Sequence, residues 1–451
     1  MGTSTITDPR AEPASRKPAV EAGLTLHESA PKALGLADQL GLWGSLGITL
    51  TLPIAAAFLP KMSLLATLVA VVVGSVAGSA LLGLAARAGA ETGAPAMVLM
   101  RGLFGLRGSY LPTALNIAQC IGWTTVEVLV IAQFGSALTT HSLRWVFLVG
   151  AGIVATLLAL RPLGFVRLLR KYAVWLALAA TLYLFIQVLR RPLPSFTRGG
   201  WSGFGTAVDL VIALPVSWIP LAADYSRHSK TPRAAFFGSF AGFATTCTIY
   251  FTLGVLALAA ALPGSDPASA LLAVPVAGIA VLVLVLDEVK EAFANLYSTA
   301  ISAQNLIPGL DRRIVAVVVG AGATAVGLLI DLTQYESYLY LIGSVFVPLF
   351  GVFAVNYFVL QRGLWDVSES ARGRWVMTLP WLAGFISYQL VNPGAVSWWK
   401  GLWPAWTPPS WLSATLVSLL VSAAGAALIG AVSRRRAGGQ RRSGSVPAAA
   451  R

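Results

Sequence analysis

The stretch LVLVLDEVKEAFANLYSTAISAQN, from Leu282 to Asn305, decides the fold class of this chain. Thirteen residues without charge, Val274 to Leu286, lead into four ionisable residues: Asp287, Glu288, Lys290 and Glu291. As one helix, the stretch places these groups near the middle of a hydrophobic span, where each charge costs at least about 2.5–3.5 kcal/mol in lipid. Charged groups at that depth normally face a bundle interior or a water-filled cavity. The stretch therefore predicts a helical membrane protein with a polar site inside it.

Helical spacing arranges the polar residues of this stretch on one face. Asp287, Glu291 and Asn295 follow one another at steps of four, and Lys290 lies beside them. One interpretation is a substrate or proton site. The alternatives are an ion-pair cluster that neutralises itself, or two short helices joined by a polar loop. We favour the substrate or proton site.

The composition supports a membrane bundle and excludes several other classes. The chain is 56% hydrophobic and 11% charged, whereas ordinary soluble domains carry about 25% charged residues. About a dozen spans of ~20 residues account for the length. The basic residues behind the net charge of +14 lie between spans and in the C-terminal tail, as the positive-inside rule predicts, and not in a nucleic-acid-binding patch. Two cysteines in apolar surroundings and three scattered histidines predict no disulfide framework, no metal site and no cofactor.

Twelve predicted spans divide the chain into four regions. Residues 1–33 form a mostly disordered cytoplasmic arm and residues 34–362 a ten-helix core. Residues 363–432 add two transmembrane helices, and residues 433–451 form a basic, disordered tail. Basic residues are in excess in the connections on the side of the N-terminus, so both termini are predicted to be cytoplasmic.

Helix breakers interrupt the first and the sixth span. The first, about Asp38 to Leu59, contains Pro53, and the sixth, about Ala207 to Ala223, contains Pro215 and Pro220. Breakers at corresponding positions five helices apart predict two five-helix halves of opposite orientation. In such an inverted repeat the broken helices meet at a site near the membrane midplane.

Two further spans contribute candidate binding residues. On the third span, Trp123 offers a flat face for a planar ring, and Glu127, one turn later, is a buried carboxylate that needs a partner or a proton. The alternative for Trp123 is ordinary core packing. On the sixth span, Ser217 and Trp218 lie between two prolines, where freed backbone groups can bind a ligand. The alternative there is a kink with a packed tryptophan.

Six stretches follow one another in a specific order between about Leu26 and Leu360: LHESAPKALGLADQLGLWGSLG, GAPAMVLMRGLFGLRGSYLP, NIAQCIGW, WIPLAADYSRH, FANLYSTAISAQN and YESYLYLIGSVFVPLFG. Together they resemble the nucleobase–cation symporter family of purine–cytosine permeases, allantoin permeases and hydantoin transporters. The resemblance implies twelve helices, ten of them in a five-plus-five inverted repeat. It also implies alternating access and uptake of a planar nitrogenous ring across the plasma membrane.

The resemblance also implies roles for the candidate site residues. Aromatic side chains of the third and sixth helices would sandwich the ring, here Trp123 and Trp218, although the family's register on the sixth helix falls about one turn earlier. Polar side chains of the third and eighth helices would hydrogen-bond the ring. They map onto Glu127, where relatives often carry an amide, and onto Glu291 and Asn295.

This sequence departs from sodium-using relatives at the positions that bind the coupling ion. Those relatives bind sodium between carbonyls of the first helix, which map onto Gly47 and Leu50, and hydroxyls of the eighth. The hydroxyl positions map onto Lys290 and the valine before it, neither of which offers a neutral oxygen. We expect Lys290, with Asp287 or Glu291, to replace sodium, which makes transport proton-coupled or ion-independent.

These observations predict a secondary active transporter that imports a nucleobase-like heterocycle, cytosine or a purine first, through the lipid bilayer of the plasma membrane. The alternative substrates are hydroxymethylpyrimidine (a thiamine precursor), allantoin and hydantoin. An enzyme is not expected, because the sequence offers no nucleophile–base or metal-ligand set. A channel is the alternative outside the class, but the polar residues converge on one depth instead of forming repeated rings.

Overall fold

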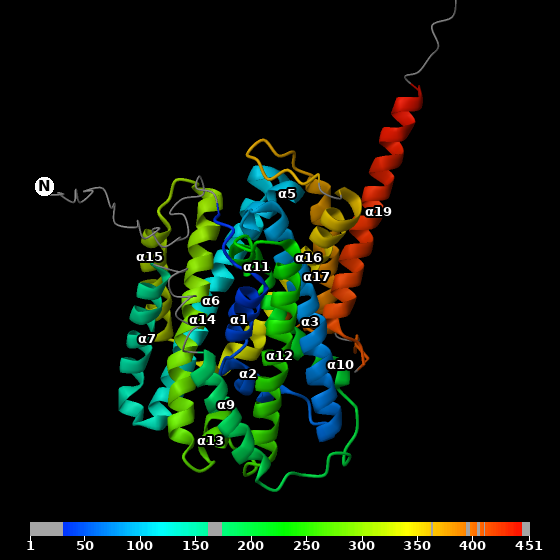
Figure 1. The fold of residues 1–451 in the computed structure, drawn as a ribbon. Coiled ribbons are helices and arrows are strands. Elements are labelled where there is room, and N and C mark those ends of the chain that lie inside the picture. Colours follow the sequence, from blue (N-terminus) through cyan, green and yellow to red (C-terminus); the bar gives the residue numbers. More distant parts are fainter. Residues whose placement is uncertain are drawn as a thin grey trace, which may run out of the picture.

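The fold is an all-helical bundle (Figure 1). The structure is a computed structural model that describes residues 30–160, 174–361, 364–393, 397–403, 406–409 and 411–443. Within these ranges the only extended pairing is one isolated bridge, between Leu34 and Ser229. The predicted fold class is confirmed.

Among the described residues, seven helices or helix pairs are long and apolar enough to cross a membrane. They are α3 (Leu64–Thr92), α6 (Tyr110–Leu138), α7 (Arg144–Ala159), α10 with α11 (Phe204–Ser217 and Ile219–Ser226), α12 (Pro232–Ala259), α16 (Tyr335–Ala354) and α19 (Ala414–Ser443). The bent pair α1 (Leu36–Leu46) and α2 (Thr51–Ala55) makes an eighth span, with an angle of 48° at its break.

Four more helices in the described part of the chain correspond to the other four predicted spans. They are α9 (Val174–Leu189), α14 (Ala277–Leu306), α15 (Arg312–Gly327) and α17 (Thr378–Val391). Shorter helices lie in the connections: α4 (Ala96–Leu99), α5 (Arg101–Gly108), α13 (Pro267–Leu272) and α18 (Ser397–Leu402). Twelve spans with breaks in the first and sixth agree with the predicted inverted repeat.

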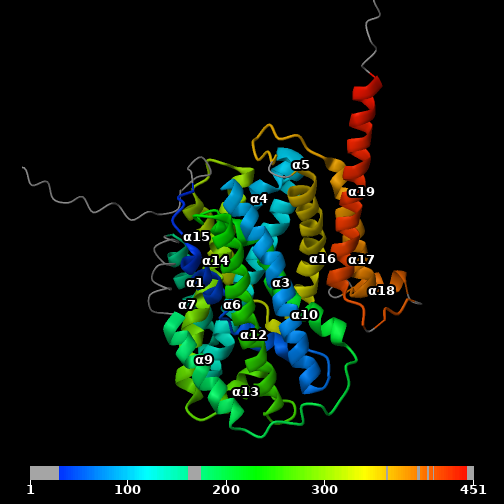
Figure 2. The ribbon, with the colours of Figure 1, turned by 45° about the vertical axis from the view of Figure 1, so that its right-hand side comes forward.

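The spans pack in three groups. We call α1, α2, α3, α10, α11 and α12 the α12 group, because α12 and α3 contact most of its other members. The helices α6, α7, α9, α14 and α15 form the α14 group, and α16, α17 and α19 pack together along one side of the bundle (Figure 2). The candidate site lies where the first two groups meet.

The break in the first span follows from close packing against α12. Gly44 and Gly242 bring the two backbones into contact, as small residues do between membrane helices. A Cβ on Gly47 would lie 2.0 Å from the hydroxyl oxygen of Thr246, so only glycine fits at the end of α1. The chain leaves the helix there and resumes helical form at Thr51.

The break in the sixth span is slighter than the break in the first. Only Trp218 separates α10 from α11, and its backbone keeps helical angles (φ −84°, ψ −13°). The second half-helix begins at Ile219, and Pro220, which lacks a backbone N–H, is its second residue. The unwound segment is therefore confined to the first span.

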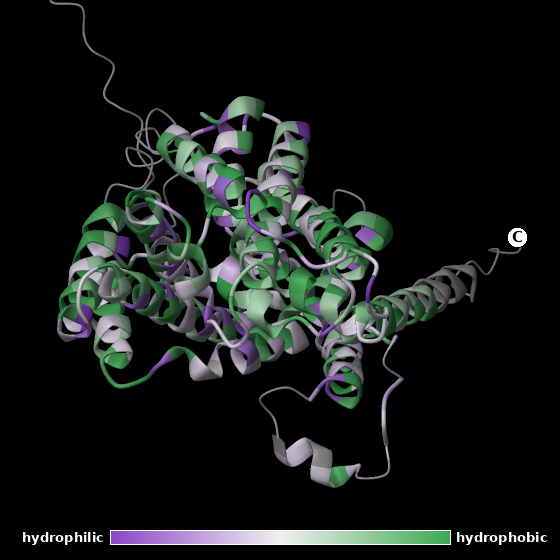
Figure 3. Cartoon of the chain, turned by 90° about the horizontal axis from the view of Figure 1, so that it is seen from below, coloured by the Kyte–Doolittle hydropathy of each residue, from purple (hydrophilic) through white to green (hydrophobic). Residues whose placement is uncertain are grey.

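The helix α14 is continuous through its charged cluster. The predicted single helix is confirmed, and the alternative of two short helices joined by a polar loop is wrong. Its first half exposes Ile279, Leu282 and Leu286, whereas nearly every residue from Asp287 to Asn305 is buried. Hydrophobic residues, green in Figure 3, are spread over the helices, and many of the large ones are exposed on the outside of the bundle. The charged half of α14 thus lies inside a bundle whose outside is apolar.

A short segment before α1 is attached to the end of the bundle. Leu34 pairs with the backbone next to Ser229, and the Lys32 ammonium donates a 2.8 Å hydrogen bond to the carbonyl of Ala90, near the end of α3. Residues 1–29 of the predicted N-terminal arm, and the tail beyond residue 443, lie outside the described residues.

His228 is buried beneath this segment. Its Nδ1 lies 3.1 Å from the carbonyl oxygen of Pro31. Burial, and then the neighbouring guanidinium of Arg227, lower the pKa of His228 to about 3. The imidazole is therefore neutral in the folded protein at physiological pH.

Candidate functional site

A narrow cavity lies beside the break in the first span, enclosed by the α12 group and the α14 group. Its lining comprises Thr49, Thr51, Leu52, Trp123, Glu127, Leu214, Ser217, Trp218, Phe243, Glu291 and Asn295. The volume in which the centre of a water molecule can move inside this cavity is about 10 Å³. The cavity can therefore hold one water molecule but not a heterocyclic ring. This conformation must therefore widen before a heterocycle can bind.

The structure brings together all six residues that sequence analysis proposed for substrate binding. They are Trp123 and Glu127 from α6, Ser217 and Trp218 from the α10–α11 junction, and Glu291 and Asn295 from α14, and all six are buried. The three segments are far apart in sequence, so the cavity is a product of the fold. Carboxylate, amide and indole groups converge on it.

Aromatic rings form one part of the cavity wall. Trp123 packs edge-on against Tyr335 and Tyr338, with ring centroids 5.9 and 5.6 Å away. Trp218 packs edge-on against Trp43 at 6.0 Å. Among the described residues, the indole N–H of Trp123 has no hydrogen-bond partner. Neighbouring rings thus pack against both indoles.

Two of the six residues use their polar groups within their own helices. The Ser217 hydroxyl donates to the carbonyl of Leu214 at 2.7 Å, and the Asn295 amide nitrogen donates to the carbonyl of Glu291 at 3.0 Å. A ligand bond from the Ser217 hydroxyl hydrogen would have to replace its bond to Leu214. The carboxyl groups of Glu127 and Glu291 are less fully used, because each has one buried oxygen without a hydrogen-bond partner in the described structure.

Two other polar residues of α6 join helices and do not line the cavity. The Asn116 amide donates to the Ser302 hydroxyl at 2.9 Å. The Gln119 amide donates to Asn116 at 2.9 Å and to the carbonyl of Ser217 at 3.2 Å. These bonds link α6 to α14 and to the sixth span, and they fix the positions of these three elements relative to one another.

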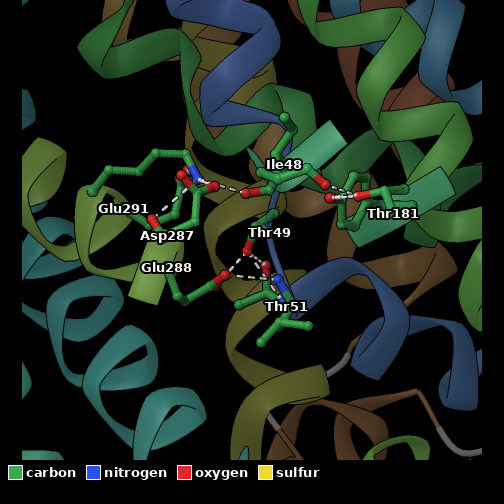
Figure 4. Close-up of polar contacts among 11 residues, drawn as sticks. Ile48, Thr49, Thr51, Thr181, Asp287, Glu288 and Glu291 are labelled. Atoms are coloured by element: carbon green, nitrogen blue, oxygen red, sulfur yellow. Dashed lines mark hydrogen bonds and ion pairs between the residues drawn. The ribbon is translucent and has the colours of Figure 1, made fainter. Parts of the chain in front are cut away.

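The predicted cation Lys290 lies against the break in the first span. Its ammonium donates to the carbonyl of Ile48 at 2.7 Å and forms an ion pair with Asp287. Its nitrogen is also 3.7 Å from an oxygen of Glu291. Figure 4 shows Asp287 and Glu291 near Ile48. A fixed positive charge therefore occupies the carbonyl end of α1.

The two predicted backbone positions, Gly47 and Leu50, flank the carbonyl that Lys290 binds. Gly47 packs against α12, as described above. The carbonyl of Leu50 accepts a bond from the N–H of Ile54 at 3.3 Å, and its own N–H donates to Glu288 at 2.8 Å. The Leu50 carbonyl is thus engaged in starting α2. Among the described residues, no group of three or more His, Cys, Asp or Glu side chains is placed to hold a metal ion.

Glu288 is a residue that sequence analysis left out of the site. Its two oxygens accept from the Thr49 hydroxyl at 2.5 Å and from the Leu50 N–H at 2.8 Å, on the unwound segment (Figure 4). The carboxyl group of Glu288 also interacts with that of Glu127. A broken helix leaves free N–H groups that need an acceptor, and this was the signal that could have identified an acid next to the break.

Comparison with known proteins agrees with this geometry. Residues 35–376 match the family model described as permease for cytosine/purines, uracil, thiamine, allantoin. Cytosine permease of Escherichia coli O157:H7 is 26% identical over 69% of this chain and 77% of its own length. A Bacillus subtilis (strain 168) protein, YxlA, whose name places it among purine-cytosine permeases, is 23% identical over 71% of this chain and 74% of its own.

Two solved structures share the fold. One is Mhp1, a nucleobase-cation-symport-1 family transporter, in a closed conformation with bromovinylhydantoin bound. It has a TM-score of 0.70 at 17% identity, over 91% of this chain and 97% of that one. The inward-facing conformation of Mhp1 has a TM-score of 0.63 at 17% identity, over 91% and 94% of the two chains.

Proposed function

We propose that this chain, which belongs to the family of permeases for cytosine/purines, uracil, thiamine and allantoin, imports a nucleobase-like planar heterocycle across the plasma membrane by alternating access. A nucleobase-type secondary transporter, and not an enzyme, is the class to which its relatives belong. Cytosine or a purine is the first candidate. The observation that carries the proposal is the convergence of Trp123, Glu127, Trp218, Glu291 and Asn295 on one buried cavity beside a broken helix.

The cavity chemistry suits a flat ring with both donors and acceptors. In the widened state, the indoles of Trp123 and Trp218 would lie against the two faces of the ring. The carboxyl groups of Glu127 and Glu291 would accept from ring N–H or amino groups, and the Asn295 amide would bond a ring carbonyl. Ser217 would contribute its backbone at the turn between the two half-helices.

The coupling arrangement favours protons over sodium. Lys290 already places an ammonium on the carbonyl of Ile48, and Asp287 neutralises it. We infer that this fixed cation replaces a bound sodium ion, so transport is proton-coupled or independent of ions. Strong sodium dependence of uptake, measured with sodium replaced by choline, would contradict the inference.

Other substrates remain as defined alternatives. Hydroxymethylpyrimidine has a flat ring with acceptor nitrogens and an exocyclic amino donor, while allantoin and hydantoin have a five-membered ring with N–H and carbonyl groups. The family description includes allantoin and thiamine, and bromovinylhydantoin is bound to Mhp1 in a closed conformation. In an inverted repeat with both termini cytoplasmic, the broken helices would meet at a single site near the membrane midplane, which favours a carrier over a channel.

A ligand screen tests the proposal directly. Purified protein is heated with cytosine, adenine, uracil, hydroxymethylpyrimidine, allantoin or hydantoin, and the unfolding midpoint is recorded. One of these compounds should raise the midpoint, since a ligand that binds the folded state stabilises it. The same compound should show saturable uptake and counterflow in proteoliposomes. Uptake that never saturates would indicate a channel, and no stabilisation by any member of the panel would refute the substrate class.

A further inference from the structure

The acidic residues around the break outnumber the cations that neutralise them. Four buried carboxyl groups, those of Glu127, Asp287, Glu288 and Glu291, face one ammonium, that of Lys290. If all four were ionised, three negative charges would stay uncompensated inside the bundle. Buried charges are tolerated only when they are paired, hydrogen-bonded or protonated. At least one proton must therefore reside in this cluster.

Hydrogen bonding distinguishes the four carboxyl groups. Asp287 is paired with Lys290, and Glu291 lies 3.7 Å from the same ammonium. Glu288 receives two donors from the unwound segment, so it is stabilised as an anion. Asp287, Glu291 and Glu127 each have one oxygen without a hydrogen-bond partner among the described residues, but only Glu127 of these three has no ion pair there, and its carboxyl group interacts with Glu288. Of the four, Glu127 has the least support as an anion.

We propose that Glu127 and Glu288 hold one transported proton between them, and that this proton decides whether the break in the first span stays attached to α14. With the proton on Glu127, its O–H donates to Glu288, which then accepts three hydrogen bonds in all. Without the proton, two adjacent carboxylates repel each other in a low-dielectric site. Repulsion would displace Glu288 and free the Thr49 hydroxyl and the Leu50 N–H.

The placement of the pair suits a coupling role. Glu127 lines the cavity where the heterocycle is proposed to bind, while Glu288 does not line it and reaches the unwound segment instead. The pair therefore joins the ligand site to the break. The proton is taken from water on the side from which the substrate enters and returns to water on the other side. No further reactant is needed.

Titratable and hydroxyl groups from several helices surround the pair of Glu127 and Glu288. The titratable and hydroxyl groups that face it are Asp287, Lys290 and Glu291 of α14, Tyr335 and Tyr338 of α16, Tyr250 of α12, and Thr49 and Thr51 at the break in the first span. Lys290 is the only cation in this set, and it is already engaged by Asp287 and Ile48. This inference names the coupling ion of the transport proposed above and so rests on that proposal.

Infrared spectroscopy tests the pair without any substrate. A protonated carboxyl group has a carbonyl stretching band that a carboxylate lacks. Relative to wild type at neutral pH, Glu127→Gln should lose the intensity of one carboxyl group. The double variant Glu127→Gln/Glu288→Gln should lose no more than the single variant, because only one proton is shared. Loss of two groups in the double variant, or of none in the single one, would overturn the shared proton.

Transport measurements test the coupling itself. In proteoliposomes with a proton gradient, Glu288→Gln should lower the ratio of internal to external substrate toward one. Exchange of substrate at equilibrium should continue. The exposed acid Glu369, changed to glutamine, is the control and should accumulate like wild type. Full accumulation by Glu288→Gln would overturn the proposal. If wild type neither exchanges nor accumulates any nucleobase, the proposed function fails, and the infrared result still decides whether the pair holds a proton.

Discussion

Replacing Lys290 by methionine should destabilise the protein strongly, and a second change should restore much of the loss. The methionine keeps the unbranched apolar stem, one atom shorter, but removes the ammonium from Asp287, Glu291 and the carbonyl of Ile48. Breaking a buried ion pair by deleting one partner typically costs about 3–5 kcal/mol, because a buried charge is left alone. We therefore expect Lys290→Met to lose about 3–5 kcal/mol of unfolding free energy.

The double variant Lys290→Met/Asp287→Asn removes the stranded charge together with its partner. Since replacing a whole buried pair by neutral groups is often nearly neutral, its loss should be smaller than that of Lys290→Met alone. The coupling energy from the double-mutant cycle should be on the order of 2–3 kcal/mol, at the upper end for residues in contact.

Unfolding by SDS in mixed micelles measures these differences. Lys61→Met is the matched control, because Lys61 is exposed and should change stability by less than about 0.5 kcal/mol. The interpretation is refuted if Lys290→Met unfolds at the wild-type SDS fraction, or if Asp287→Asn restores no stability. Either result would mean that the ammonium is hydrated and does not hold the break.

Trp123→Ala and Asn295→Ala should each weaken ligand binding at least tenfold, about 1.4 kcal/mol, in thermal-shift titrations while the elution volume stays unchanged; undiminished affinity in both would remove the proposed site. His228→Gln should reduce the loss of stability between pH 7 and pH 5. The folded pKa of about 3 lies below the ordinary value near 6.5, so stability is complete above pH ~6.5 and falls as the pH drops toward 3, by about 2 kcal/mol at pH 5. A variant with an unchanged pH profile of the unfolding midpoint would contradict this. Gly47→Ala should cost about 1–3 kcal/mol through its clash with Thr246, and Thr246→Ala should recover part of it; full stability of the single variant would show that the helices separate easily.

Sequence analysis predicted those features that depend on periodicity. The steps of four from Asp287 to Asn295 placed these residues on one face, and the continuous helix α14 keeps them there. The breakers in the first and sixth spans identified where the cavity forms, and Trp218 reaches it although the family register placed the aromatic a turn earlier. Helix geometry alone sufficed for these predictions.

Features that depend on side-chain direction could not be predicted. The orientation of Glu288 toward Leu50 depends on where the unwound segment begins and ends, which a shift of one residue would change. The Ser217 hydroxyl bonds to Leu214 because its rotamer points back along the helix. The small size of the break at Trp218 could not be predicted either, because two nearby prolines are compatible with a straight helix and with a strongly bent one.

The contact between Gly44 and Gly242 has a consequence for motion. Because the two backbones are in direct contact there, we expect α1 and α12 to move together as one body. The hinge then has to be elsewhere, at the thin polar boundary where Thr49, Leu50 and Ile48 meet α14.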